Sequence, residues 1–223
     1  MKSKIGLRTN HMFKFNVVSV AEVNRELKAL KRKKATGCDD LPSCMLKDCA
    51  NTISKPVTHL INLSLSSGIF PTDWKLAFLN PVFKSGRTDL FENYRPISIL
   101  PVLSKVLEKK IKKQVMEYLS ETYLLSENQF GFRCKRSTEL ASILFTDSIR
   151  KEVDQGKMVG AIFIDLSKAF DTISHAKLLD KLKQYGICNK ELMWFTDYLF
   201  NRSQQVKYNG VTSERNAVFN GVP

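Results

Sequence analysis

The stretch that decides the fold reads FIDLSKAFDT and occupies residues 163–172. The residues leading into it, Val159 to Ile164, form an apolar run that ends at Asp165. A short apolar run that stops at a carboxylate is typical of a buried β-strand with an acid at its tip. Oxygen ligands suit Mg²⁺, and nucleotidyl transfer uses two such ions about 3.5–4 Å apart. Taken alone, however, Asp165 fits a helix cap or a loop residue better than a metal ligand.

Further elements follow on both sides of this stretch. Ser19 and Glu22 form a capping box before a helix with apolar residues at 20, 23, 27 and 30. A second apolar stripe over 46–65 is expected to be divided by Pro56 and stopped by Gly68. The remaining expectations are a strand within 74–83, a loop over 84–93, helices over 102–119, 178–185 and 192–199, and a hairpin centred on Asn209-Gly210. This mixture predicts an α+β or α/β fold.

The net charge of +13 and the pI near 9.5 favour a polyanionic partner, of which nucleic acid is the commonest. A basic protein without such a partner stays possible on charge alone. The run from Lys31 to Lys34 could touch phosphate, although a solvated helix end is the commoner reason for such a run.

The five cysteines include no C-x-x-C pair, which argues against a disulfide framework or a zinc site and favours a reducing compartment. No apolar run approaches the ~20 residues that span a bilayer. Residues 1–10 are basic and polar with no apolar segment behind them, so we expect neither a secretory signal nor a membrane partner.

Several segments, in order along the chain, resemble the motifs of reverse transcriptases. Residues 163–172 are similar to the first conserved palm motif in the form typical of non-LTR elements and group II introns. The other matching segments are ATGCDDLP (35–42), FPTDWK (70–75), PVFK (81–84), NYRPISIL (93–100), QFGFR (129–133) with Ser137-Thr138, and NGVP (220–223). The resemblance covers nearly the whole chain beyond about residue 20, and the jockey or CR1-like branch is the nearest in style.

This resemblance implies a role for each matching residue. Asp165 is implied to be catalytic and to be the first carboxylate that binds Mg²⁺. Phe170 is implied to be a steric gate under the incoming sugar, although it could equally be a core aromatic. Asp171 fits the motif as an orienting or structural residue.

The resemblance also implies a nucleotide-binding set. Lys84 and Arg95 would grip the triphosphate of the incoming nucleotide, which suits a cationic point charge and a planar guanidinium fork. Backbone N–H groups around Lys168 and Ala169 would face phosphates as well. The alternative for either cation alone is an ordinary solvated surface position.

A third set, Gln129, Gly131 and Arg133, is implied to lie near the template–primer, although Phe130 and Phe132 beside them could simply pack. Cys38 and Asp40 stand where the family usually has Pro and Gly, and Asn80 stands where an apolar residue is common. The three histidines are scattered, and none is assigned a role.

The implied fold is the right-hand polymerase fold of class α+β, with fingers and the first part of the palm. We divide the chain into an N-terminal flank (1–18), a helical and fingers region (19–158) and the start of the palm (159–223). The implied enzyme is an RNA-directed DNA polymerase that works on an RNA template, a DNA primer and deoxynucleoside triphosphates. The family also implies nuclear action, a longer polymerase and a probable endonuclease domain.

The chain stops at Pro223, before the family's Gln-Gly-Ser, the Tyr/Phe-x-Asp-Asp motif and the thumb. We therefore expect these residues alone to be inactive, and we expect an open apolar face at Val159–Ile164 to cause aggregation. The alternatives are a domesticated, non-catalytic nucleic-acid-binding remnant and, more weakly, a basic scaffold protein. By this reasoning the polymerase interpretation falls if Asp165 faces solvent, far from Lys84 and Arg95.

Overall fold

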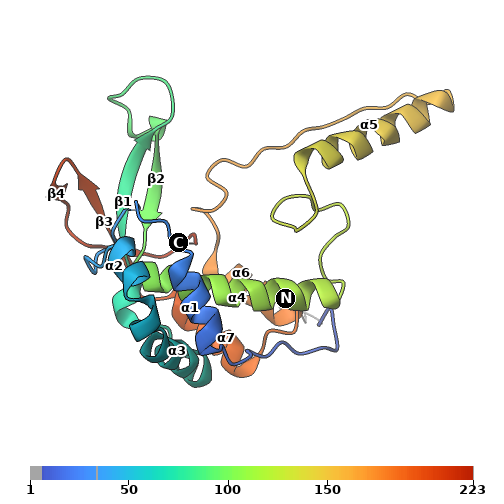
Figure 1. Cartoon of the computed structure of the whole chain (residues 1–223). Helices are drawn as coiled ribbons and strands as arrows, with labels where there is room; N and C mark the ends of the chain where they lie inside the picture. Colours follow the sequence, from blue (N-terminus) through green and yellow to red (C-terminus); the bar gives the residue numbers. More distant parts are fainter. Residues whose placement is uncertain (1–6, 34, 223) are drawn as a thin grey trace.

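The computed structural model describes residues 7–33 and 35–222. The first six residues of the expected flank, Lys34 of the basic run and the terminal Pro223 lie outside the described residues. Figure 1 shows three parts: a group of helices, a twisted sheet above it, and a helical arm that projects away from both.

The helical group contains α1 (Val20–Lys28), α2 (Ser43–Asp48), α3 (Ala50–Ser67), α4 (Val102–Glu121) and α7 (Asn189–Leu199). The expected capping box is confirmed, because Ser19 accepts from the Glu22 N–H while the Glu22 carboxylate accepts from the Ser19 N–H. The helices bury a common apolar core, whose members include Val23, Leu27, Ala50, Val57, Ile61, Leu65, Phe70, Val106, Leu107, Ile111 and Trp194. This core is the largest apolar contribution to the stability of the chain.

The expected division at Pro56 is wrong. Helix α3 runs through Pro56 without a break, and the chain is interrupted at Cys49 instead, between α2 and α3. Pro56 and Thr52 are both exposed, so the Thr52 carbonyl that loses its helical partner can face water. Gly68 does end the helix, with a left-handed φ of 75°.

The segment before α1 is an extended strap across the helices. The Asn62 side chain accepts from the Val18 N–H at 2.8 Å and donates to the Val18 carbonyl at 2.9 Å. Gln114 makes the same pair of bonds to the backbone of Asn16, at 2.8 and 3.0 Å. The strap buries Phe13, which is 4% exposed. These residues of the expected flank are therefore part of the packed body.

The sheet is mixed, with strand order β2-β1-β3-β4, and β5 also pairs with β3. Its strands are β1 (Leu76–Phe83), β2 (Tyr94–Ile99), β3 (Arg202–Tyr208), β4 (Val211–Thr212) and β5 (Asn216–Val218). Strands β1 and β3 are parallel, and the other pairs are antiparallel. Residues on both sides of the expected boundary at 158 thus share one sheet.

Two prolines face each other across β1 and β2, at Pro81 and Pro96. In this antiparallel ladder the neighbouring Lys84–Asn93 position is hydrogen-bonded, with 2.8 Å between the Lys84 N and the Asn93 O. Hydrogen-bonded and non-bonded pairs alternate, so Pro81 and Pro96 occupy a non-bonded pair where neither needs an N–H. The proline in NYRPIS is therefore compatible with strand β2, which we did not predict.

The arm consists of helix α5 (Thr138–Asp154) and the extended residues that run back toward the body beside it (Figure 1). Helix α5 was not predicted, although Ser137 caps it by accepting from the Leu140 N–H at 3.2 Å. None of its residues is buried. The arm therefore packs mainly on itself, as in the edge contact between the Phe145 and Phe163 rings at 5.6 Å.

The expected buried strand at Val159–Ile164 is wrong in this structure. The segment is extended without strand pairing, and Ile162, Phe163 and Ile164 are 90%, 82% and 84% exposed. A β-strand needs a neighbouring strand to satisfy its backbone groups, and no described strand lies beside this segment. The apolar pattern indicates side chains that favour burial, but it does not show whether a neighbouring strand is present to cover them.

The last elements are α6 (His175–Gln184), α7 and the β3–β4 hairpin. The hairpin turn is confirmed, because Asn209 and Gly210 both have positive φ, at 48° and 80°. Gly186 ends α6 as expected, with φ of 81°.

Candidate functional site

The loop after Asp165 folds back on itself at residues 168–172. Lys168 has a left-handed φ of 50°, and its carbonyl accepts from the Asp171 N–H at 3.0 Å and the Thr172 N–H at 3.2 Å. The segment 220–222 lies directly against this loop, since the Val222 N–H donates to the Phe170 carbonyl at 3.1 Å. These backbone bonds fix the part of the segment 163–172 that adjoins the body.

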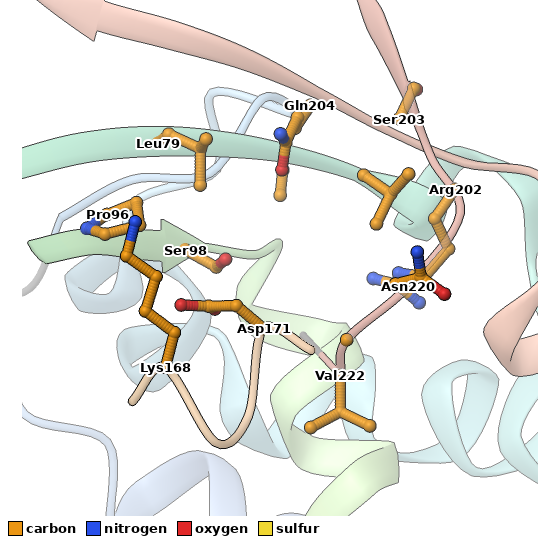
Figure 2. Close-up of a pocket in the computed structure, with 13 residues that line it drawn as sticks. Leu79, Pro96, Ser98, Lys168, Asp171, Arg202, Ser203, Gln204, Asn220 and Val222 are labelled. Atoms are coloured by element: carbon orange, nitrogen blue, oxygen red, sulfur yellow. The ribbon is translucent and has the colours of Figure 1, made fainter. Parts of the chain in front are cut away.

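A hollow of about 270 Å³ separates this loop from the sheet. Figure 2 shows the side chains of Lys168 and Asp171 rising from the loop toward β2, where Pro96 and Ser98 lie. The remaining lining residues come from β1, β3, β5 and the segment 220–222: Ala77, Leu79, Arg202, Ser203, Gln204, Val218, Asn220, Gly221 and Val222. The hollow combines a cation, a carboxylate and amide groups, which suits a polar ligand.

A second hollow of about 570 Å³ lies on the other side of Lys168. Its wall contains the aromatic side chains of Phe91, Tyr94 and Tyr208, of which Phe91 is 96% exposed. Aromatic rings beside a cation offer a stacking surface for planar groups.

Arg202 connects the first hollow to the helical core. It is 4% exposed, and its guanidinium lies 5.1 Å from the Tyr198 ring centroid and 5.7 Å from that of Phe70. The guanidinium also donates to the Tyr198 carbonyl at 3.1 Å. Burial lowers the pKa of Arg202, and nearby Tyr198 and Glu108 partly offset this effect.

Glu108 is the acidic neighbour of this group. Burial raises the pKa of its carboxyl, and the Ser104 hydroxyl, which donates to it at 2.8 Å, and nearby Arg202 reduce the rise. Burial also raises the pKa of Tyr198, and Glu108 adds to that rise. The helix over 102–119 was predicted from its apolar repeat alone, and that repeat gives no signal for this half-buried carboxyl.

The polar face of α4 is only partly solvated. Lys110 is 7% exposed, and its Nζ lies 3.1 Å from the Glu26 Oε1 atom. Lys109 contacts the other oxygen of the same carboxylate. The lysines of α4 therefore include structural cations that hold α1, and these cannot all belong to a nucleic-acid surface.

Asp165 faces solvent in this structure, at the end of the exposed run. This differs from the expected carboxylate on a buried strand, and the physical reason is the same lack of a strand partner. Phe170 is 57% exposed and meets the Phe132 ring edge-on at 6.0 Å, so it is not a core aromatic. Ala169, the residue before Phe170, is exposed as well.

Of the two predicted triphosphate cations, Arg95 lies on the opposite face of the sheet from Lys168, and Lys84 lies just beyond the end of β1. Tyr94 and Pro96 both line the second hollow beside Lys168, so Arg95 between them points the other way. Lys84 follows Phe83 at the end of β1 and is exposed. The structure thus brings Lys168 together with Asp171, but it does not bring either one together with Lys84 or Arg95.

Lys207 shares a face with Arg95 and was missed by the sequence reasoning. Its neighbours Val206 and Tyr208 line the second hollow, and its own Nζ lies 4.9 Å from the Phe78 ring centroid on the other face. The only sequence signal in this region was the turn of the hairpin. The cations on this face of the sheet therefore include Lys207 of β3 as well as Arg95 of β2.

The third predicted set lies in a loop whose side chains donate hydrogen bonds to the loop's own backbone. Gln129 donates from its side chain to the Gly131 carbonyl at 3.2 Å, and Arg133 donates to the Ser126 carbonyl at 2.7 Å. Phe132 is 77% exposed, so simple packing does not account for it. The loop approaches the site through the ring contact with Phe170.

No group of three or more His, Cys, Asp or Glu residues within 7–33 and 35–222 could hold a metal ion. None of the described helices is long and apolar enough to cross a membrane.

Comparison with known proteins identifies the family. Residues 83–223 match the family model of reverse transcriptase (RNA-dependent DNA polymerase). In Drosophila melanogaster, the probable RNA-directed DNA polymerase from transposon BS is 31% identical over 78% of this chain and 20% of its own length. Those from transposon X-element and mobile element jockey are 28% and 29% identical, over 94% and 93% of this chain and 23% of each relative.

The chain spans about a fifth of the length of these relatives. The family match depends on a pattern over the whole of 83–223, not on the orientation of one side chain, so the exposed Asp165 does not overturn it. The chain belongs to the reverse transcriptase family, with the non-LTR retrotransposon polymerases as its relatives.

Proposed function

We propose that this chain forms the fingers and the first part of the palm of an RNA-directed DNA polymerase. The observation that carries the proposal is the family match over 83–223, a region that contains the loop 165–171 and most of the residues that line its two hollows. The net charge of +13 fits an RNA template and a DNA primer. The proposed reaction is attack of a primer 3′-hydroxyl on the α-phosphate of a deoxynucleoside triphosphate, with pyrophosphate as the leaving group.

Mg²⁺ is the cofactor in this proposal. Asp165 offers a solvent-facing carboxylate, which is the hard oxygen ligand that this ion prefers. Bound Mg²⁺ would neutralise charge on the phosphates and lower the pKa of the attacking hydroxyl. One carboxylate binds such an ion weakly, so we expect residues 1–223 alone not to polymerise.

The other residues of the site have positioning and electrostatic roles in the proposal. Lys84 and Arg95 attract the triphosphate, and the backbone N–H groups around Lys168 and Ala169 face its oxygens. Phe170 lies under the sugar and disfavours a 2′-hydroxyl. Its 57% exposure leaves the ring accessible to a ligand.

The proposal requires residues 159–167 to lie differently in the assembled polymerase, so that Asp165 comes near the triphosphate that Lys84 and Arg95 attract. Such a rearrangement is favoured by burial. Covering the exposed side chains of Ile162, Phe163 and Ile164 is worth about 1.5–3 kcal/mol for each residue. A packed palm sheet would provide that cover.

The proposal can be tested first on the gene. The DNA and the transcript beyond codon 223 should continue in frame through Gln-Gly-Ser and an Asp-Asp block. A stop codon directly after codon 223 in an expressed transcript would reject the polymerase and favour the alternative below.

A binding experiment tests the nucleic-acid role on the 223-residue chain itself. We expect fluorescence anisotropy to show binding to an RNA–DNA primer–template whose affinity falls steeply with salt. The double variant Lys84→Ala/Arg95→Ala should reduce the slope of log affinity against log salt by about 2. The charge-matched variant Lys28→Ala/Lys55→Ala, at exposed positions of the helical group, should leave that slope unchanged. Equal slopes for the two variants would remove Lys84 and Arg95 from the site.

A domesticated nucleic-acid-binding remnant is the second candidate. The observation that favours it is the solvent-facing Asp165, in a chain that keeps its strong positive charge. This candidate predicts salt-dependent binding that Asp165→Ala does not change in the presence of Mg²⁺. For either candidate we propose action in the nucleus, where the family primes on chromosomal DNA.

A further inference from the structure

His175 is a buried histidine with no part in the site described so far. It is the first residue of α6 and is 5% exposed. Its Nε2 atom lies 2.7 Å from the Gly221 carbonyl oxygen. A carbonyl can only accept, so Nε2 carries the proton and donates. The ring also meets the Phe200 ring edge-on, at 5.7 Å.

The carbonyl that His175 holds belongs to a segment without helix or extended strand. Within 220–222, the Gly221 N–H donates to the Ile173 carbonyl at 2.8 Å, and Asn220 forms an isolated bridge with Ser174. The position of this segment therefore depends on a few bonds, and within the described residues the side chain that supplies one of them is His175.

Gly221 must also fit closely against the loop of the site. Its φ is +84°, and a Cβ atom there would lie 2.9 Å from the Asp171 carbonyl oxygen. Asn220, Gly221 and Val222 line the first hollow together with Lys168 and Asp171 of the adjoining loop. A displacement of Gly221 thus changes the lining of this hollow directly.

We propose that His175 is a positioning residue that holds segment 220–222 against the loop 168–171 and so sets the wall of the nucleotide site. The nucleotide part of this inference rests on the proposed function. The holding part concerns only contacts within the described chain. His175 acts through Gly221 and does not touch the ligand.

Three variants separate the hydrogen bond from the packing of the ring. His175→Phe keeps an aromatic ring beside Phe200 but removes the donor, whereas His175→Gln keeps an N–H donor at similar reach. His59→Phe, at an exposed position on α3, is the control for a histidine change elsewhere. Amide hydrogen exchange of Gly221 and Val222 reports the docking of the segment, and the Leu107 amide of the core reports global stability.

We expect His175→Phe to speed exchange at Gly221 and Val222 by roughly fivefold to tenfold, the effect of one lost hydrogen bond. Leu107 should exchange at an unchanged rate, and His175→Gln should return Gly221 and Val222 to within about twofold of the original rate. Unchanged exchange in His175→Phe, equal acceleration at Leu107, or no rescue by His175→Gln would each overturn the inference.

Nucleotide affinity tests the connection to the site. We expect His175→Phe to weaken binding of a deoxynucleoside triphosphate with Mg²⁺ by a factor similar to its effect on exchange, and His175→Gln to restore it. If the nucleotide affinity stays unchanged in His175→Phe while segment 220–222 is less firmly docked, the positioning role is overturned. An unmodified chain that binds no nucleotide would instead count against the proposed function, while the exchange rates would still decide the role of His175.

Discussion

Removing the Arg202 cation should destabilise the chain in a manner that depends on pH. Arg202→Met keeps an unbranched apolar stem against Tyr198 and Phe70 but removes Arg202 from beside the half-buried Glu108, where Lys105 is the other nearby cation. Removing one member of a buried charged group costs about 3–5 kcal/mol. Because Arg202 and Glu108 act on each other without a direct ion pair, we expect about 2–4 kcal/mol at pH 8.

The sign of the pH dependence follows from the Glu108 pKa. Burial raises that pKa in the folded chain, so its contribution to stability is present below the unfolded carboxyl pKa and is lost as pH rises through the folded pKa. Arg202 lowers the folded pKa, so Arg202→Met raises it further and moves the loss to higher pH. The variant should therefore lose more stability between pH 5 and pH 8 than the unmodified chain does, at about 1.4 kcal/mol for each pH unit in that window.

Urea unfolding at pH 5 and pH 8 provides the assay, with fluorescence from Trp74 and Trp194, which are 8% and 1% exposed. The double variant Arg202→Met/Glu108→Gln carries no titrating carboxyl at 108 and should lose the added pH dependence. An identical loss of stability at both pH values in Arg202→Met, or a pH dependence that survives in the double variant, would refute this reasoning.

Three further predictions concern the core, the arm and the loop. Trp194→Phe should lower the free energy of unfolding by about 1–3 kcal/mol, because the indole donates to the Ser64 hydroxyl at 3.0 Å. In urea unfolding, the double variant Trp194→Phe/Ser64→Ala should lose less stability than the sum of the losses in the two single variants. Ile162→Thr/Ile164→Thr should reduce self-association in light scattering, since both side chains are over 80% exposed, and a monodisperse unmodified monomer at tens of micromolar would contradict the expectation. Gly221→Ala should lower the thermal midpoint by the equivalent of about 1–2 kcal/mol, because alanine is strained in the left-handed backbone of Gly221. An unchanged midpoint would show that the loop can move to accommodate the added methyl group at no cost in stability.

Local signals predicted the local structure well. The capping box at Ser19, the left-handed Gly68 and the Asn209-Gly210 turn each depend on a few neighbouring residues, and all three are present. The apolar stripe of α4 was likewise sufficient to predict that helix, because its repeat is long. These elements need no knowledge of distant contacts.

Predictions that depended on tertiary partners were less successful. Strand β2 was not predicted because it contains Pro96. A proline is acceptable in a strand only where the ladder needs no N–H, and that depends on the register with Pro81. The apolar repeat of α4 gave no sign that Glu108 is half-buried and that Lys110 is buried. Their burial follows from where Arg202 and Glu26 lie, and no helical period contains that information.

The candidate site likewise has one part that this chain fixes by itself and one part that depends on a packing partner. The loop from Lys168 to Thr172 is held by backbone bonds and by the close fit of Gly221, all supplied by residues of this chain. Asp165 lies just before that loop, at the end of an apolar run that this chain leaves uncovered. Three exposed apolar side chains represent roughly 5–9 kcal/mol of burial that a packing partner could recover, which is comparable with the whole stability of a typical domain. In the proposed polymerase, the partner of that run would therefore set the position of the carboxylate, whereas the loop that contacts the hollow is already set by this chain.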